Sequence, residues 1–182
     1  MTNLENNPII AAVRSEADLK EAVNTSVEII FLLRSSILTL PEMINLVHEK
    51  HKLIFVHSDF SDGIGNDKDG IAYLKSLGVD GIISTRSVII KYAKELNLLT
   101  VQRFFIVDSH SIDTAIDAIN IARPDMIEIM PGIMSKIIEK FSEAVRSPVI
   151  AGGLIESKQE VIDALSAGAT GISTNAKKLW NA

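Results

Sequence analysis

The sequence has 182 residues, of which 47% are hydrophobic, with a formal net charge of −5 and no cysteine. This length and apolar content predict one domain, residues 1–182, with a substantial core. The missing cysteines exclude disulfides and thiolate metal sites, and the negative charge argues against a broad nucleic-acid surface while leaving room for a local basic patch.

The amino-terminal segment, residues 1–7, is polar and lacks the basic start and apolar stretch of a signal peptide. The apolar runs, such as residues 29–33, are far too short to cross a bilayer. We therefore expect a soluble, cytoplasmic protein with no membrane partner.

Eight short apolar runs recur along the chain, and helical patterns separate them. The predicted strands are residues 9–13, 27–33, 53–56, 81–86, 98–107, 126–130, 148–153 and 171–175. Ser15 and Thr39 have the spacing of helix caps with an acidic residue three positions later. The remaining helices are predicted to end near Gly78, to span residues 88–96 and 108–120, to end near Arg146, to begin at Ser157 and to span residues 177–180.

Eight units of a strand followed by a helix predict a compact (β/α)8 TIM-type barrel with short helices. Because this fold usually takes about 200 residues or more, we expect the helices to be short and one helix to be missing or replaced. An open doubly wound sheet is the alternative, but it would require discarding two or three good apolar runs.

The most informative stretch is residues 148–155, an apolar run that contains Gly152 and Gly153 near its end. Ser157 and Glu160 follow with the spacing of a capping box, so we expect the glycines to lie just ahead of a helix. Glycine can take positive φ and lets a ligand approach the backbone amides. The pattern predicts an anion-binding turn.

A second polar turn, made by Ser173, Thr174 and Asn175, follows the eighth predicted strand. In (β/α)8 barrels the loops after strands seven and eight commonly build a phosphate site. We therefore predict that this turn and the Gly152-Gly153 turn bind a phosphate together. Two tight turns without a ligand are the plainer alternative.

Glu128 stands between two isoleucines in the sixth predicted strand. Because side chains alternate along a strand, isoleucines that face the helices would point this carboxylate into the barrel mouth. A buried carboxylate needs donors. We expect Glu128 to accept hydrogen bonds from ligand hydroxyls or to form an internal ion pair with Arg14, Arg86 or Arg103, and the two roles are compatible.

Other polar side chains lie near the ends of predicted strands. Arg14, Arg86 and Arg103 are placed where guanidinium groups suit either a phosphate or a structural ring of ion pairs. His57 and Asp59 are predicted on one face of the third strand, where they form an acid–base pair or stand at an ordinary loop edge.

Signals for catalysis are weaker. No lysine is predicted at the carboxyl end of a strand, which argues against Schiff-base chemistry. His48 and His51 are expected to face solvent on a helix, and no histidine pair has metal-ligand spacing on one element. We predict no cofactor and no metal, and a site for a small polar phosphate ester without an evident catalytic set.

The chain resembles the glycerol-3-phosphate-responsive antiterminators of bacterial glycerol-uptake operons, in register from Pro8 to Trp180. The resemblance rests on residues 81–86, 102–103, 127–132, 148–155 and 178–180 taken together. It implies a regulator that, with glycerol 3-phosphate bound as effector, acts on leader mRNA so that transcription passes a terminator. Residues 128–132 and the glycine pair also resemble the substrate site of prenylglyceryl-phosphate synthase barrels, which supports the ligand more than the activity.

The resemblance does not place the RNA surface. Lys177, Lys178 and Trp180 offer charge and a stacking plane, although a tryptophan in the last helix more often packs against the barrel. The leading hypothesis is an antiterminator that is not an enzyme. The alternative is an enzyme acting on a triose or glycerol phosphate, with His57, Asp59 or Glu128 as base. The oligomeric state, a homo-oligomer included, stays open.

Overall fold

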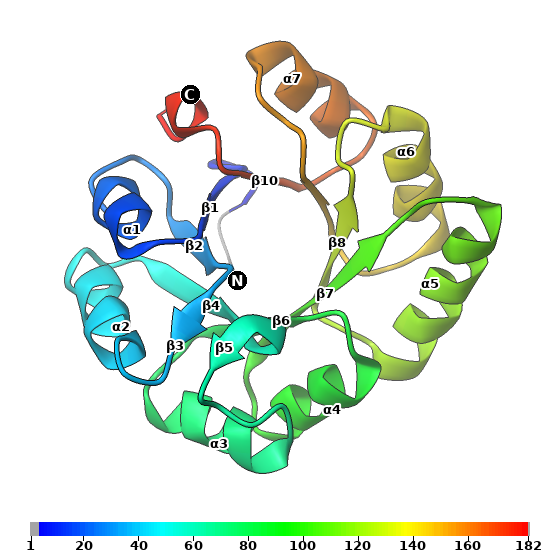
Figure 1. Ribbon diagram of the computed structural model, residues 1–182. Helices are drawn as coiled ribbons and strands as arrows, with labels where there is room; N and C mark the ends of the chain where they lie inside the picture. Colours follow the sequence, from blue (N-terminus) through cyan, green and yellow to red (C-terminus); the bar gives the residue numbers. More distant parts are fainter. Residues whose placement is uncertain (1–3, 182) are drawn as a thin grey trace.

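The protein, seen in a computed structural model that describes residues 4–181, forms a closed barrel of eight parallel strands inside a ring of helices (Figure 1). The barrel strands are β1 (Ile9–Val13), β2 (Ile29–Leu32), β4 (Leu53–His57), β6 (Gly81–Ser84), β7 (Leu99–Phe105), β8 (Met126–Met130), β9 (Val149–Gly152) and β10 (Gly171–Thr174). Each pairs with the next, and β10 closes the barrel on β1. The predicted (β/α)8 barrel is therefore confirmed and the open sheet is wrong.

Within the described residues, seven α-helices surround the strands. They are α1 (Glu16–Ala22), α2 (Leu40–Glu49), α3 (Lys68–Ser76), α4 (Ser87–Glu95), α5 (Ser109–Ala122), α6 (Ser135–Ala144) and α7 (Lys158–Ser166). The last strand is followed by a 3-10 turn, η2 (Lys177–Leu179), which takes the place of the eighth helix. This is the replacement that the short chain predicted.

The helix caps follow the sequence in two of three cases. The Ser15 hydroxyl accepts the amide of Asp18, and Ser157 and Glu160 form a complete capping box at α7. Thr39 was expected to cap α2, and this expectation is wrong: its backbone is helical, at φ −111° and ψ −18°, and its side chain makes no capping hydrogen bond. A hydroxyl caps best from an extended backbone, which Ser15 and Ser157 have.

Strand alternation divides the apolar side chains into two cores. One lies between the strands and the helices and contains, among others, Ile127 and Ile129 of β8. The other fills the barrel interior below its mouth, where the rings of Phe31 and Phe55 meet at 5.5 Å. The side chains two positions after an interior residue, such as His57 after Phe55, therefore reach the mouth.

Two short segments above the barrel form a sheet that the sequence did not predict. β3 (Ser35–Ser36) pairs in parallel with β5 (Ser61–Asp62), and the Ser35 and Ser61 hydroxyls hydrogen-bond at 2.9 Å. This small sheet, visible at the front of Figure 1, ties the loop after β2 to the loop after β4. A 3-10 turn, η1 (Ser58–Phe60), joins β4 to β5.

Three predicted positions differ from the structure. β6 ends at Ser84, two residues early, because the amide of Thr85 donates to Asp59 Oδ2 instead of continuing the strand. His48 is not simply solvent-facing, since its Nε2 lies 2.9 Å from Asp80 Oδ2. His51 lies beyond the end of α2 with a φ of 57°.

Candidate functional site

Two hollows occupy the mouth of the barrel, at the carboxyl ends of the strands, where sites of this fold lie. The first hollow, about 460 Å³, is lined by Ala12, Arg14, Leu33, Arg103, Phe105, Glu128, Met130, Pro131, Gly153, Leu154, Ile155, Glu156, Ser173, Thr174 and Asn175. The second hollow, about 250 Å³, is lined by Arg14, Leu33, Arg34, His57, Phe60 and Arg103. The shared residues make the two hollows neighbours, with guanidinium groups between them.

A buried ion pair lies in the wall of the first hollow. Arg103 and Glu128 are register partners on β7 and β8, and Arg103 Nε donates to Glu128 Oε2 at 2.6 Å. The side chains are only 6% and 1% exposed. Of the alternatives drawn from the sequence, the structure thus gives Glu128 an internal partner, and that partner is Arg103.

The second oxygen of Glu128 has no donor. Oε1 is buried and makes no hydrogen bond with the described residues. It lies where a side chain at position 152 would stand, since a Cβ on Gly152 would come within 2.3 Å of it. A buried carboxylate oxygen without a donor is costly, so this atom is suited to receive a hydrogen bond from a bound molecule.

Two residues of the turn after β9, Gly153 and Leu154, line the first hollow. Gly153 and Leu154 both have positive φ, 78° and 62°, and their amides donate no hydrogen bond within the described chain. The turn is held by the amide of Gly132, which donates to the carbonyls of Gly152 and Gly153 at 2.6 and 3.1 Å. Consecutive free amides of this kind form a concave anion site.

The two glycines of the predicted turn have different roles. Gly152 does not take positive φ; it lies in β9, and its lack of a side chain makes room for Glu128. The glycines lie ahead of α7, separated from its N-cap Ser157 by three residues, and the amides of Glu156 and Ser157 are already taken by Glu160 Oε2. The free amides therefore belong to the turn and not to the helix terminus.

The turn after β10 lies beside the glycine turn, as the sequence predicted. Ser173, Thr174 and Asn175 all line the first hollow. The Thr174 hydroxyl donates to the carbonyl of Ile155 and accepts the amide of Ala176, so it joins the two turns. Ser173 and Asn175 are left to face a ligand.

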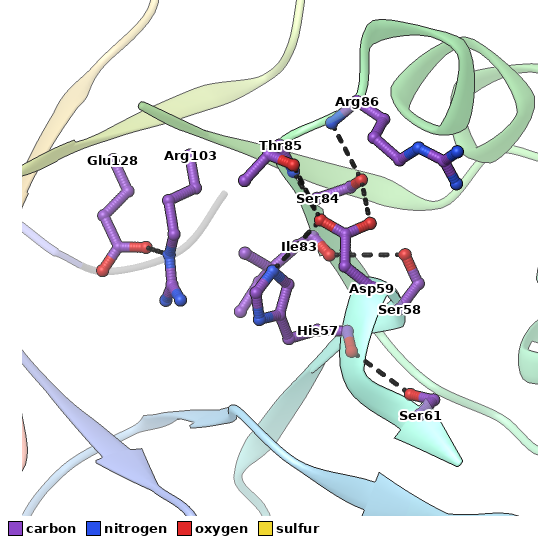
Figure 2. A network of polar contacts seen from close by, with 10 residues as sticks. All are labelled: His57, Ser58, Asp59, Ser61, Ile83, Ser84, Thr85, Arg86, Arg103 and Glu128. Carbon is purple, nitrogen blue, oxygen red and sulfur yellow. Dashed lines mark hydrogen bonds and ion pairs between the residues drawn. The ribbon is translucent and has the colours of Figure 1, made fainter. Parts of the chain in front are cut away.

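His57 and Asp59 come together near the second hollow (Figure 2). His57 Nε2 lies 3.3 Å from Asp59 Oδ2, but neither ring nitrogen has a well-formed hydrogen bond with the described residues. Asp59 lies on η1 and not on β4, so the expectation that it shares a strand face with His57 is wrong. The chain leaves the strand at His57, and the turn brings the carboxylate back toward the ring.

Asp59 is held as a carboxylate by its neighbours. Burial would raise the pKa of this group, but contacts from His57, Ser84 and Thr85 outweigh burial and hold its pKa well below the usual value. The Ser84 hydroxyl donates to Oδ1 at 2.6 Å, and the amide of Thr85 donates to Oδ2 at 2.8 Å. Asp59 lines neither hollow, and its contacts make it a brace between η1 and β6.

The predicted arginines separate into two groups. Arg14 lines both hollows, as does Arg103. Arg86 is the residue before α4 and lines neither hollow, and Figure 2 shows its side chain directed away from Arg103 and Glu128. The expectation that Arg86 joins the others fails because β6 ends two residues before it.

The sequence reasoning missed Arg34 and Phe60 as residues of the mouth. Each directly precedes a strand of the small sheet, β3 or β5, and the pairing of these strands brings both over the second hollow. The one available signal was the position of Arg34 just after an apolar strand.

The described residues contain no group of three or more His, Cys, Asp or Glu side chains that could hold a metal ion. Over residues 4–181, no helix has the length and apolar content that a membrane span requires.

These observations define a (β/α)8 barrel whose mouth carries a charged hollow of ligand size. The model of the family described as glycerol-3-phosphate responsive antiterminator matches residues 9–180, and the chain belongs to this family. The resemblance to this family that the sequence motifs indicated is confirmed. Membership of a regulatory family favours a regulator over an enzyme.

Three relatives match over nearly their full length. The uncharacterized protein YgcP of Escherichia coli K12 is 35% identical over 97% of this chain and 93% of its own. The crystal structure of a glycerol uptake operon antiterminator regulatory protein from Listeria monocytogenes has a TM-score of 0.92 at 32% identity, covering 96% of this chain and 95% of its own. An antiterminator-related protein from Thermotoga maritima has a TM-score of 0.85 at 32% identity, covering 94% and 96%.

More distant structures share the fold alone. An aldolase, QR15, has a TM-score of 0.75 at 12% identity, covering 97% of this chain and 93% of its own. The orotidine 5'-phosphate decarboxylase of Pyrococcus horikoshii has a TM-score of 0.71 at 17% identity, covering 93% and 94%. At these identities the likeness shows the barrel and carries no activity to this chain.

Proposed function

We propose that the protein is a glycerol-3-phosphate-responsive antiterminator that acts in the cytoplasm on the leader mRNA of glycerol-utilisation operons. The family and the names of the solved relatives support a regulator of this type. The chemistry of the first hollow supports the effector.

The observation that carries the proposal is the unpartnered Oε1 of Glu128 in the same hollow as the free amides of Gly153 and Leu154. The carboxylate oxygen requires a donor, which a ligand hydroxyl supplies. The amides suit a phosphate. Glycerol 3-phosphate has a phosphate at one end and two hydroxyls along its three carbons, so it satisfies both.

The charge of the mouth fits an anionic effector. Arg103 is neutralised by Glu128, but the guanidinium of Arg14 has no ion pair within the described residues. A phosphate ester would bring the missing negative charge. In this proposal the ligand orders the loops after β8, β9 and β10, and so favours an RNA-competent state by binding it more tightly than the alternative state.

Calorimetric titration with glycerol 3-phosphate tests the effector. We expect saturable heat at one ligand per chain, with glycerol and inorganic phosphate binding more weakly because each satisfies half of the hollow. Glu128→Gln should weaken binding about tenfold or more, the value of a hydrogen bond to a charged group. Glu139→Gln, an exposed acid on α6, is the matched control. No heat with the unaltered chain, or equal losses in both variants, would count against the effector.

Filter binding of leader RNA tests the regulatory part. With glycerol 3-phosphate present, we expect retention that weakens as salt rises, because phosphate contacts release counterions. Retention should be much lower without the ligand. Equal retention with and without the ligand would reject gating.

The geometry gives less support to an enzyme. Neither hollow is lined by a lysine, so the Schiff base that some aldolases form has no nucleophile here. Asp59 is committed to Ser84 and Thr85, which leaves it outside the hollows. Glycerol 3-phosphate or a triose phosphate should therefore be recovered unchanged after long incubation with the protein.

A further inference from the structure

The second hollow has a chemistry that the proposed effector does not use. Its polar lining consists of three arginines and one histidine, and no carboxylate lines it. Arg34 has a partner, Asp62, only at 3.8 Å. Arg103 uses its Nε for Glu128, and Arg14 has no ion pair within the described chain. The hollow is therefore an electropositive recess next to the first.

His57 provides an independent sign that this recess receives a ligand. The ring is only 2% exposed and lines the hollow; its Nε2 lies 3.3 Å from Asp59 Oδ2, while Nδ1 has no partner among the described residues. Buried polar groups are nearly always satisfied by protein, water or ligand. A buried imidazole nitrogen without a partner, on a ring that lines a recess, is therefore suited to form a hydrogen bond with a bound ligand.

The second hollow is also preorganised by contacts within the protein. The pairing of β3 with β5 fixes the loops that carry Arg34 and Phe60, and the hydroxyl of Ser61 donates back to the carbonyl of His57. The ring of Phe60 packs on His57 with an edge contact at 4.9 Å between centroids. A rigid frame of this kind lowers the entropy that binding must lose.

We propose that the second hollow is an oxyanion subsite, separate from the phosphate position in the first hollow, and that it binds a phosphate group through Arg34, His57 and the shared Arg14 and Arg103. Planar guanidinium groups and an imidazole donor match the oxygens of a phosphate. The phosphate has two possible sources, the second phosphoryl group of a small ligand or a phosphodiester of RNA.

Nuclear magnetic resonance of the full chain tests the subsite with inorganic phosphate as probe. The ring signals of His57, assigned with a His57→Gln variant, should shift saturably, while those of His48 and His110 stay in place. Arg34→Gln removes a cation that lines only the second hollow and is largely exposed, so it should fold. We expect it to weaken the response at His57 by roughly tenfold, the value of one charge-assisted hydrogen bond.

Arg146→Gln is the matched control, because Arg146 is exposed in the connection between α6 and β9, at the opposite end of the barrel. It should leave the response unchanged within about twofold, the size of a typical surface substitution. No saturable response at His57, or equal losses in the Arg34 and Arg146 variants, would overturn the subsite. Asn175→Ala, which changes only the first hollow, should weaken glycerol 3-phosphate without changing this response, so the two proposals fail separately.

Two further titrations distinguish the sources. If the phosphate belongs to a small ligand, 1,3-propanediol bisphosphate should bind more tightly than glycerol 3-phosphate, and Arg34→Gln should remove the advantage. If it belongs to RNA, Arg34→Gln should lower the salt slope of RNA binding by about one. If Arg34→Gln changed neither titration, the assignment of the subsite would be overturned.

Discussion

Arg103 donates its Nε to Glu128 Oε2 at 2.6 Å, across the register that pairs β7 with β8. The pair does two things at once. It gives the buried carboxylate a hydrogen-bond donor, and it leaves Oε1 without a partner among the described residues at the wall of the first hollow. Stability and ligand capture are therefore linked at this pair.

Glu128→Ala should lower the free energy of unfolding by about 3 kcal/mol, because it leaves the guanidinium of Arg103 buried and unpaired. Urea denaturation measures the change. The double variant with methionine at positions 103 and 128 should lose less than the single variant, since it removes both charges. Glu139→Ala should stay within about 0.5 kcal/mol, as surface substitutions usually do. A larger loss in the double variant would contradict the assigned pairing.

Gly152→Ala should displace the Glu128 carboxylate, because the new Cβ would come within 2.3 Å of Oε1. We expect a loss of about 1–3 kcal/mol of stability from overpacking, together with weaker binding of glycerol 3-phosphate. Gly171→Ala on the neighbouring strand β10 is the control, since a Cβ there meets its nearest atoms at 3.4 Å. If calorimetry found the two variants equal in ligand affinity, the close approach to Glu128 would not matter for binding.

Lowering the pH should reduce the free energy of unfolding through protonation of Asp59. Its pKa is lower in the folded chain than in the unfolded chain, so its contribution is present above the ordinary carboxyl pKa, about 4, and is lost as pH falls through the folded pKa. Between about pH 4 and 2, the unaltered chain should therefore lose stability more steeply than Asp59→Asn. Urea denaturation across this range checks the slopes. Asp113→Asn, at an exposed position on α5, should behave like the unaltered chain.

Trp180 should act in folding and not in RNA stacking. Its side chain is 1% exposed, and Nε1 donates to the carbonyl of Thr174 at 2.9 Å. Trp180→Phe should lower stability by about 1–2 kcal/mol through the lost hydrogen bond and volume. RNA retention at a temperature where the variant is folded should not change. A variant that melts normally but fails to retain RNA would show that the ring contacts the nucleic acid.

Much of this site could be predicted from the sequence, because it depends on the alternation of side chains along a strand and on which strand each polar turn follows. The alternation of Met126-Ile127-Glu128-Ile129 points Glu128 into the mouth, and the two polar turns after the last strands meet as barrels of this kind require. The sequence alone could not choose between Arg14, Arg86 and Arg103 as the partner of Glu128. That choice depends on register, which pairs Arg103 with Glu128.

The second hollow was beyond sequence reasoning for a physical reason. It depends on pairing between β3 and β5, two segments of two residues each that have no apolar pattern and meet through serines. Asp59 was misplaced because the chain leaves β4 for a 3-10 turn, and Arg86 because β6 stops short. In each case a local side-chain contact overrode the extended pattern.

The most direct test of the account is a crystal structure of the protein with glycerol 3-phosphate. We predict the phosphate against the amides of Gly153 and Leu154, beside Ser173 and Asn175, with a ligand hydroxyl donating to Glu128 Oε1. A ligand bound outside the first hollow, or one that leaves Oε1 without a donor, would contradict the account.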